Sequence, residues 1–135
     1  MRGILLIVDG YNVTISSWPH LELPRQRHHL VDALAELAMR TGLQVHVVFD
    51  GTDLTNRFGP PAAARRRMRV TFSPDGVEAD QVIVNLVDRL DPAQPVVVAT
   101  DDREVRDGVR RRGANVISVA QLLAVLRRAP GSAAG

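Results

Sequence analysis

The sequence predicts an α/β fold in which helices cover both faces of a parallel sheet. Short apolar runs alternate along the chain with segments of helical periodicity, as in successive βαβ units. Apolar residues make up 45% of the sequence and aromatic residues only 4%, so the core must consist mainly of Val, Leu, Ile and Ala. At 135 residues the chain is long enough for one domain with a single core and too short for two.

Five apolar runs rich in β-branched residues predict the strands. Each run is short and nearly continuous, as expected for a strand that is buried on both faces of a sheet. The predicted strands are residues 3–8, 44–49, 69–73, 95–100 and 114–117.

Four segments with apolar residues at helical spacing predict the helices. In the first of them, Leu30, Leu34 and Ala38 share one face, and Gly42 provides the C-terminal stop. The last opens with the capping-box pattern that starts at Ser118. The predicted helices are residues 25–41, 79–90, 103–112 and 118–128.

Three of the predicted strands run directly into aspartate. The run "ILLIVD" ends on Asp9, "VHVVFD" ends on Asp50, and "VVVATDD" ends on Asp101 and Asp102. Because right-handed crossovers send parallel strands in the same direction, these acids should gather at the carboxyl edge of the sheet, where open α/β sheets bind ligands. Asp80 joins them if the helix 79–90 begins at that edge.

So many carboxylates at one edge require compensation. Two unit charges about 4 Å apart repel by roughly 4 kcal/mol at an effective dielectric constant of about 20. A divalent cation among the acids is the economical explanation, and a set of hard oxygen ligands favours Mg²⁺ or Mn²⁺ over zinc.

The composition excludes several other kinds of site. All 17 of the Lys and Arg residues are arginine, and cysteine is absent. A Walker A loop, a phosphoacceptor receiver domain and Schiff-base chemistry all need a lysine. Disulfides and thiolate metal sites are excluded as well. A phosphatase of the haloacid dehalogenase type is disfavoured, because Tyr11 occupies the position where such a site has its second aspartate.

Four motifs together resemble a known family. "VDGYN" after the first strand, "VVFDG" after the second, "EAD" at the start of a helix and "TDDREVR" after a later strand are similar to the NYN domain family, in particular its YacP-like branch, over residues 3–127. That family belongs to the PIN-like ribonucleases. The resemblance implies a three-layer domain whose five-stranded parallel sheet has the order 3-2-1-4-5, with acids that hold divalent metal and hydrolyse RNA.

The resemblance also implies roles for particular residues. The expected catalytic residues are Asp9, Asn12, Asp80 and Asp102. The three aspartates are the expected metal ligands, and Asp101, which stands where serine is more usual, is a competing ligand. Apart from the resemblance, Asp50, Glu78 and Thr100 are expected to support the ligands by orienting arginine or water without contacting the metal.

Several of these acids also have a purely structural interpretation. Asp9 is placed to cap a turn before Gly10, and Asn12 to form a local side-chain turn. Asp80 lies where an acid complements the helix dipole, and either Asp101 or Asp102 is placed to be the N-cap of the next helix.

Arginines and one aromatic residue are candidates for RNA contact. The segment "AAARRRMR" carries Arg65, Arg66, Arg67 and Arg69, and Arg103 directly follows the strand-end acids. Arg103, Arg106 and Arg110 have the spacing of a stripe on one helix face. Tyr11 follows the first strand and is suited to stack on an unpaired base, with Trp18 as a weaker candidate.

We therefore expect a metal-dependent endoribonuclease that uses Mg²⁺ or Mn²⁺ and acts on single-stranded RNA or mRNA. The alternative is an RNA-binding module that keeps the fold without turnover. The domain is expected to span residues 1–128, with a disordered tail at 129–135. The sequence contains no signal-peptide pattern and no apolar run of membrane-spanning length, so we expect a cytoplasmic protein. Ribosome association and homo-oligomerisation stay open.

Overall fold

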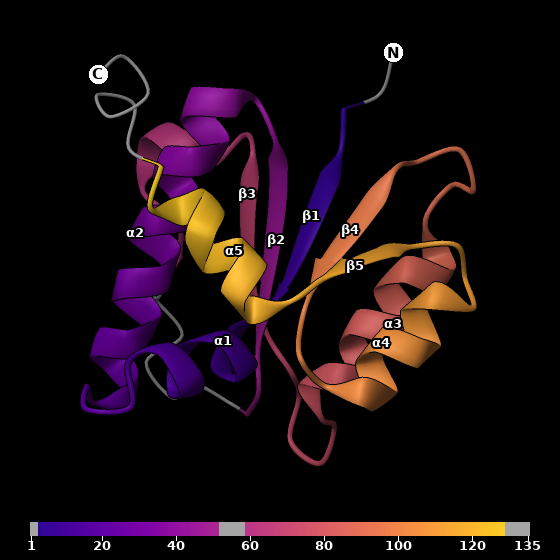
Figure 1. Cartoon of the computed structure of the whole chain (residues 1–135), viewed down its shortest axis with the longest axis horizontal. Coiled ribbons are helices and arrows are strands. Elements are labelled where there is room, and N and C mark those ends of the chain that lie inside the picture. Colours follow the sequence, from indigo (N-terminus) through magenta and orange to yellow (C-terminus); the bar gives the residue numbers. More distant parts are fainter. Residues whose placement is uncertain (1–2, 52–58, 129–135) are drawn as a thin grey trace.

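The computed structural model describes residues 3–51 and 59–128, and the predicted tail at 129–135 lies outside these ranges. Within them, one sheet of parallel strands crosses the molecule, with β1 at its centre (Figure 1). The order is β3-β2-β1-β4-β5, which confirms the predicted order 3-2-1-4-5. The strands are β1 (Leu5–Asp9), β2 (Gln44–Phe49), β3 (Met68–Phe72), β4 (Val96–Ala99) and β5 (Asn115–Ile117).

Helices cover both faces of the sheet and give the three predicted layers. α1, α2 and α5 pack on one face and α3 and α4 on the other, as Figure 1 shows. The helices are α1 (Gly10–Ser17), α2 (Leu23–Thr41), α3 (Ala79–Arg89), α4 (Arg103–Arg110) and α5 (Val119–Leu126), with a 3-10 turn η1 (Ala62–Ala64) before β3. None of the helices in the described ranges is both long and apolar enough to cross a membrane.

The alternation of side chains along β1 builds two separate cores. Leu6 and Val8 face the layer formed by α1, α2 and α5, whereas Ile7 between them faces α3 and α4. All three are buried, and Ile7 and Val8 have no exposed surface. The near-continuous apolar run that predicted this strand therefore reflects burial on both faces.

Helix ends explain where the arginines lie. The helices that follow the strands begin at the carboxyl edge of the sheet and end at the amino edge, and the last turns of α2, α3 and α4 carry Arg40, Arg89 and Arg110. Cations near a helix C-terminus are favoured by the helix dipole. α2 ends as predicted at Gly42, which adopts a φ of 79° and donates its N–H to the Ala38 carbonyl over 2.8 Å.

Among the α-helices of the described ranges, α1 is the one that the sequence pattern did not predict. It begins at Gly10, directly after the last residue of β1, with no turn between them. A methyl group at Gly10 would lie 2.6 Å from Cε1 of Phe49 and 2.9 Å from the Val48 carbonyl oxygen. Only glycine fits there, so its role is to let α1 start in contact with β2.

We expect Gly10→Ala to destabilise the protein by about 1–3 kcal/mol, because the added methyl group overpacks the contact between α1 and β2. Urea denaturation measures this loss. Gly59→Ala is the control, since nothing lies within 4 Å of a methyl group at that position. Equal stability of the two variants would contradict the close approach described here.

Candidate active site

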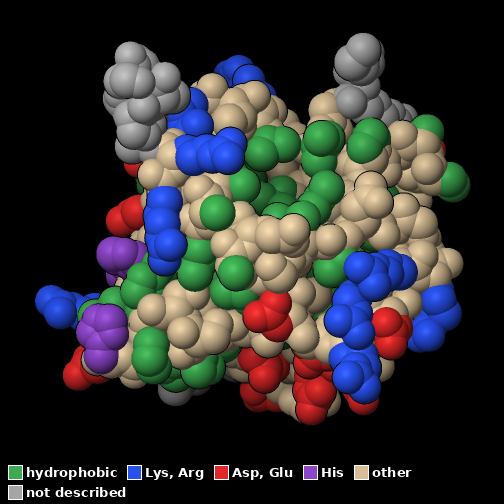
Figure 2. Space-filling view, in the orientation of Figure 1, with side chains coloured by type: hydrophobic (Ala, Val, Ile, Leu, Met, Phe, Trp, Pro, Cys, Tyr) green, Lys and Arg blue, Asp and Glu red, His purple; other side chains and the backbone are tan. Residues whose placement is uncertain are grey.

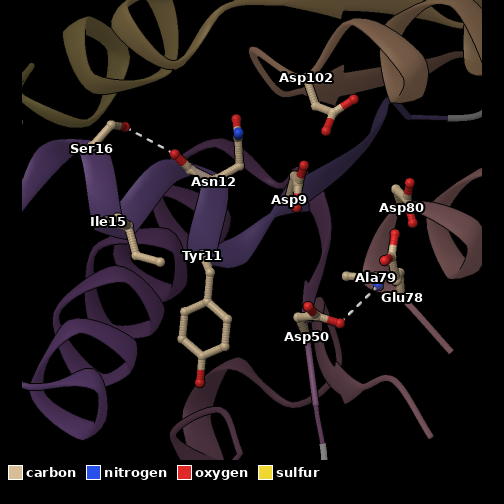
Figure 3. A pocket seen from close by; sticks show the side chains of 10 residues that line it. All are labelled: Asp9, Tyr11, Asn12, Ile15, Ser16, Asp50, Glu78, Ala79, Asp80 and Asp102. Carbon is tan, nitrogen blue, oxygen red and sulfur yellow. Dashed lines mark hydrogen bonds between the residues drawn. The ribbon is translucent and has the colours of Figure 1, made fainter. Parts of the chain in front are cut away.

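A pocket of about 400 Å³ opens at the carboxyl edge of the sheet. Its lining joins residues at or just after the ends of β1, β2 and β4 with residues of α1 and of the start of α3 (Figure 3). Carboxylates dominate one side, and α1 forms the other. The lining residues are Asp9, Tyr11, Asn12, Ile15, Ser16, Asp50, Glu78, Ala79, Asp80 and Asp102.

The topology brings the acids to this edge. Asp9 is the last residue of β1, Asp50 follows β2, and Asp102 stands between β4 and α4. Asp80 arrives because the chain stays at the edge after β3: the Ser73 N–H donates to the Phe49 carbonyl over 2.9 Å, and α3 begins a few residues later.

Asp9 is the buried member of the group, with 8% of its surface exposed. Burial, together with smaller contributions from the charges of Asp102, Asp80 and Asp50, raises the pKa of its carboxyl from 3.8 to about 6. The Thr100 hydroxyl opposes this rise by donating to Oδ2 of Asp9 over 2.9 Å. Such a raised pKa indicates that no positively charged group among the described residues compensates the negative charge of Asp9 and its neighbouring acids.

Thr100 and Asn12 connect the pocket walls. The Thr100 hydroxyl also accepts the Asp102 N–H over 3.0 Å, so one buried side chain orients β1 and the start of α4 together. Oδ1 of Asn12 accepts the Asp101 N–H over 2.8 Å, which joins α1 to the same loop. Asn12 thus makes a contact across the fold instead of a local turn.

The two neighbouring aspartates after β4 point to different places. Asp102 lines the pocket and caps α4, since its Oδ1 accepts the N–H groups of Glu104 over 2.8 Å and Val105 over 3.1 Å. Oδ1 of Asp101 accepts the Val119 N–H at the start of α5 over 3.0 Å, and Asp101 does not line the pocket.

The remaining acids sit near the start of α3. Oδ1 of Asp50 accepts the Ala79 N–H over 3.1 Å and the Ser73 hydroxyl, so within the described residues its partners are a helix start and a serine rather than an arginine. The charge of Asp80 raises the pKa of the exposed Glu78 carboxyl. Both residues line the pocket beside Asp80.

Tyr11 and Ile15 form the apolar side of the pocket. They lie four residues apart on α1 and therefore on one helix face. The Tyr11 hydroxyl accepts a hydrogen bond from Arg27 over 2.9 Å and its ring packs 5.0 Å from that of Phe49, which fixes its orientation. The sequence analysis did not predict Ile15, Ser16 and Ala79 as site residues. The four-residue spacing between Tyr11 and Ile15 could have indicated that Ile15 lies on the same helix face as Tyr11. Trp18 instead packs edge-on against His29, outside this pocket.

The predicted RNA-binding arginines fall into two groups. Arg103 adjoins the acids, and the stripe continues along α4 to Arg110, away from them. Figure 2 shows basic side chains over α4 beside the acidic lower edge. Arg65, Arg66 and Arg67 precede β3 and so lie at the amino edge, where Arg67 donates to the Gly42 carbonyl over 3.0 Å.

Arg69 belongs to the first part of β3, near the same amino edge. A strand of five residues spans roughly 16 Å. The segment from Arg65 to Arg69 is therefore not brought to the pocket, because all parallel strands begin at the edge opposite the acids.

The donor chemistry of the pocket fits a hard divalent cation. Its charged groups are carboxylates only, which suit Mg²⁺ or Mn²⁺. In residues 3–51 and 59–128, no three acidic or histidine side chains converge closely enough to form a finished metal site. The pocket therefore contains residues of the right type to bind the cation, but within the described ranges their carboxylates do not converge on one point.

The model of one protein family, the YacP-like NYN domain, matches residues 6–134. The chain belongs to this family. Two crystal structures of Rae1 (YacP) from Bacillus subtilis, one of them a mutant, are similar to it with TM-scores of 0.73 and 0.71 and 29% sequence identity. The alignments cover 90% and 93% of this chain and 72% and 75% of those chains. No curated protein matches significantly.

Membership of the YacP-like NYN family confirms the resemblance that the motifs indicated. The family is one of PIN-like ribonucleases, so a nuclease fold is shown for this chain. The pocket lies at the edge where the acids of the NYN motifs meet.

We expect Asp9→Asn to stabilise the protein in the absence of divalent metal. Because the folded-state pKa is raised from 3.8 to about 6, the folded state binds the Asp9 proton more tightly, and stability falls as the pH rises between these values. The difference corresponds to roughly 3 kcal/mol. Asparagine carries no charge to bury, so the variant does not lose stability in this pH range. The stability that Asp9→Asn gains over the wild type should be full above pH 6 and vanish below pH 4.

Urea denaturation in EDTA at pH 3.5, 5 and 7.5 measures this gain. Asp32→Asn, which neutralises an exposed carboxylate on α2, is the control. A gain in Asp9→Asn that did not depend on pH would show that charge burial is not its cause.

Proposed function

We propose that this protein is an endoribonuclease that depends on Mg²⁺ or Mn²⁺ and hydrolyses RNA at the carboxylate pocket. The observation that carries the proposal is Asp9, a buried carboxylate with a raised pKa that faces three further acids in a fold shared with ribonucleases. Burying such a group is costly, which supports a role in binding a cation.

Asp9, Asp80 and Asp102 would hold the metal. When bound, a divalent cation lowers the pKa of its water ligand and neutralises charge on the scissile phosphate. Thr100 keeps Oδ2 of Asp9 in position, and Asn12 holds the loop that presents Asp102. Asp101 is left out of the ligand set, because its carboxylate caps α5 outside the pocket.

The substrate that fits the pocket is single-stranded RNA. Its carboxylate side suits a phosphate with bound metal, and the side formed by Tyr11 and Ile15 suits a base. Ile15 is 53% exposed, so its apolar surface is free to contact a ligand. Bases of an unpaired strand can reach such a surface, whereas bases within a duplex are stacked.

Arg103, Arg106 and Arg110 supply a path for the flanking phosphates. Arg103 follows Asp102 directly, and the three residues extend along α4 from the pocket toward the amino edge. Phosphate contacts of this kind contribute affinity without sequence preference.

One observation favours the alternative, an RNA-binding module without turnover. Asp80 accepts the Gln81 N–H over 2.7 Å and Asp102 caps α4, so both carboxylates already have backbone partners, and the acids of the described segments do not converge. Binding with no cleavage would distinguish this alternative.

The first test is cleavage of unstructured RNA with Mn²⁺, with Mg²⁺ and with EDTA. We expect cleavage with either metal and none with EDTA, and loss of cleavage in Asp9→Asn, Asp80→Asn and Asp102→Asn with RNA binding retained. Mn²⁺ at a hundred times its dissociation constant should also stabilise the wild type by roughly 2.7 kcal/mol. Binding without cleavage and without a metal-induced shift would favour the inactive module.

The second test compares two triple variants that lower the net charge equally. Replacing Arg103, Arg106 and Arg110 with alanine should weaken RNA binding and reduce the salt dependence by about 2 in log–log slope, since each lost phosphate contact contributes about 0.7. Turnover at saturating RNA should change little, as expected when uniform binding is lost.

Replacing Arg65, Arg66 and Arg67 is the matched control at the amino edge. We expect this variant to keep the affinity and salt slope of the wild type for a short RNA. Equal weakening in the two variants would refute the α4 path and restore the predicted role of the segment before β3.

A further inference from the structure

Asp50 contacts the first residue of α3 from another part of the chain. Its Oδ1 accepts the Ala79 N–H over 3.1 Å and the Ser73 hydroxyl over 3.2 Å, and Figure 3 shows the first of these bonds. Ser73 is 1% exposed, and its hydroxyl oxygen accepts the Gly51 N–H over 2.9 Å. The end of β2, the end of β3 and the start of α3 are therefore joined at one oxygen atom.

This contact replaces a cap that α3 lacks. The first N–H groups of a helix have no partner within the helix and usually bond to the side chain of the N-cap residue. The N-cap of α3 is Glu78, whose side chain makes no such bond. Asp50 supplies a carboxylate from 29 residues away, which also complements the positive end of the helix dipole.

The position of Asp80 depends on this first turn. Asp80 is the residue after Ala79 and lines the pocket with Asp9. Its carboxylate accepts the Gln81 N–H over 2.7 Å and interacts with the Glu78 side chain, and both partners belong to the start of the same helix. Among the bonds described, none fixes Asp80 directly to β1 or β2. The location of its Cα relative to Asp9 is therefore set by where α3 begins.

We propose that Asp50 is a positioning residue for Asp80. It holds the start of α3 at the carboxyl edge through its hydrogen bonds to Ala79 and Ser73, and it acts by accepting these bonds and not by contributing charge to a metal. Its effect on cleavage rests on the proposed ribonuclease function, whereas its hold on α3 does not.

The fold provides a matched control for this role. Asp101 makes the same kind of bond, because its Oδ1 accepts the N–H of Val119, the first residue of α5, over 3.0 Å. No residue of α5 lines the pocket. Asp50→Ala and Asp101→Ala therefore remove the same charge and the same type of hydrogen bond. α5 keeps the capping box of Ser118 and Gln121 and carries no pocket residue, whereas α3 loses its side-chain cap and carries Asp80.

A second pair of variants separates the hydrogen bond from the charge. Asp50→Asn keeps an oxygen acceptor for Ala79 and removes the negative charge, whereas Asp50→Ala removes both. If Asp50 positions α3, asparagine should restore what alanine loses. If Asp50 is a metal ligand, asparagine should fail as alanine does.

The experiment measures kcat and KM for cleavage of an unstructured RNA with Mn²⁺, and amide hydrogen exchange at Ala79. We expect Asp50→Ala to lower kcat roughly tenfold to a hundredfold, as a misplaced group does, with KM nearly unchanged. Asp50→Asn and Asp101→Ala should keep kcat near wild type. The Ala79 amide should exchange faster in Asp50→Ala alone.

Several results would overturn the proposal. These are a wild-type kcat in Asp50→Ala, a loss in Asp50→Asn as large as in Asp50→Ala, and an equal loss in Asp101→Ala, which would indicate general destabilisation. If Asp50→Ala does not fold, Ser73→Ala takes its place and should show a smaller loss in kcat.

Failure of the ribonuclease function itself is recognised separately. If the wild type cleaves no RNA, the proposed function fails, and the exchange measurement still tests the hold of Asp50 on α3. Equal protection of the Ala79 amide in the wild type and in Asp50→Ala would then overturn the inference.

Discussion

The burial of Asp9 at the end of the central strand is the constraint on which the carboxyl edge depends. Its charge is unfavourable there, and further carboxylates stand nearby. The same topology that gathers the acids also delivers helix starts to this edge, with N–H groups that need acceptors. Asp50, Asp101 and Asp102 each accept N–H groups from a different helix, α3, α5 and α4. Most of the acids at this edge are thus tied to backbone, and Asp9, held by the Thr100 hydroxyl, is the one that stays buried beneath them.

The fold was predictable because its strands are buried on both faces. Leu6, Ile7 and Val8 form an apolar run that only a central parallel strand explains, and α2 and α3 show clear apolar stripes. α1 escaped prediction for physical reasons. It starts with glycine, ends with two serines, buries Thr14 and exposes Ile15, so it has neither a strong helix propensity nor a continuous apolar stripe. Its place is fixed instead by the contact of Gly10 with β2, which no local pattern encodes.

The sequence predicts the position of a site residue when that residue ends a strand, but not when it lies in a turn. Asp9 follows from the end of β1, but Asp101 and Asp102 are neighbours whose directions depend on the backbone between β4 and α4. The structural interpretation of Asp102 as an N-cap and its place in the pocket are both correct, since one oxygen caps α4 while the residue lines the pocket. The location of Arg65, Arg66 and Arg67 at the amino edge could have been predicted from the sequence, because residues that precede a parallel strand lie at the edge opposite those that follow one.

The separation of acids and arginines along the strands has a consequence for how the molecule meets other charged molecules. Its net charge of +2 is small, but carboxylates occupy one edge while Arg40, Arg89 and the segment before β3 lie at the other. A polyanion therefore meets different charges at the two edges, in addition to a weak overall attraction. At the carboxyl edge the acids repel a polyanion, and the column of basic side chains over α4 extends positive charge toward these acids (Figure 2).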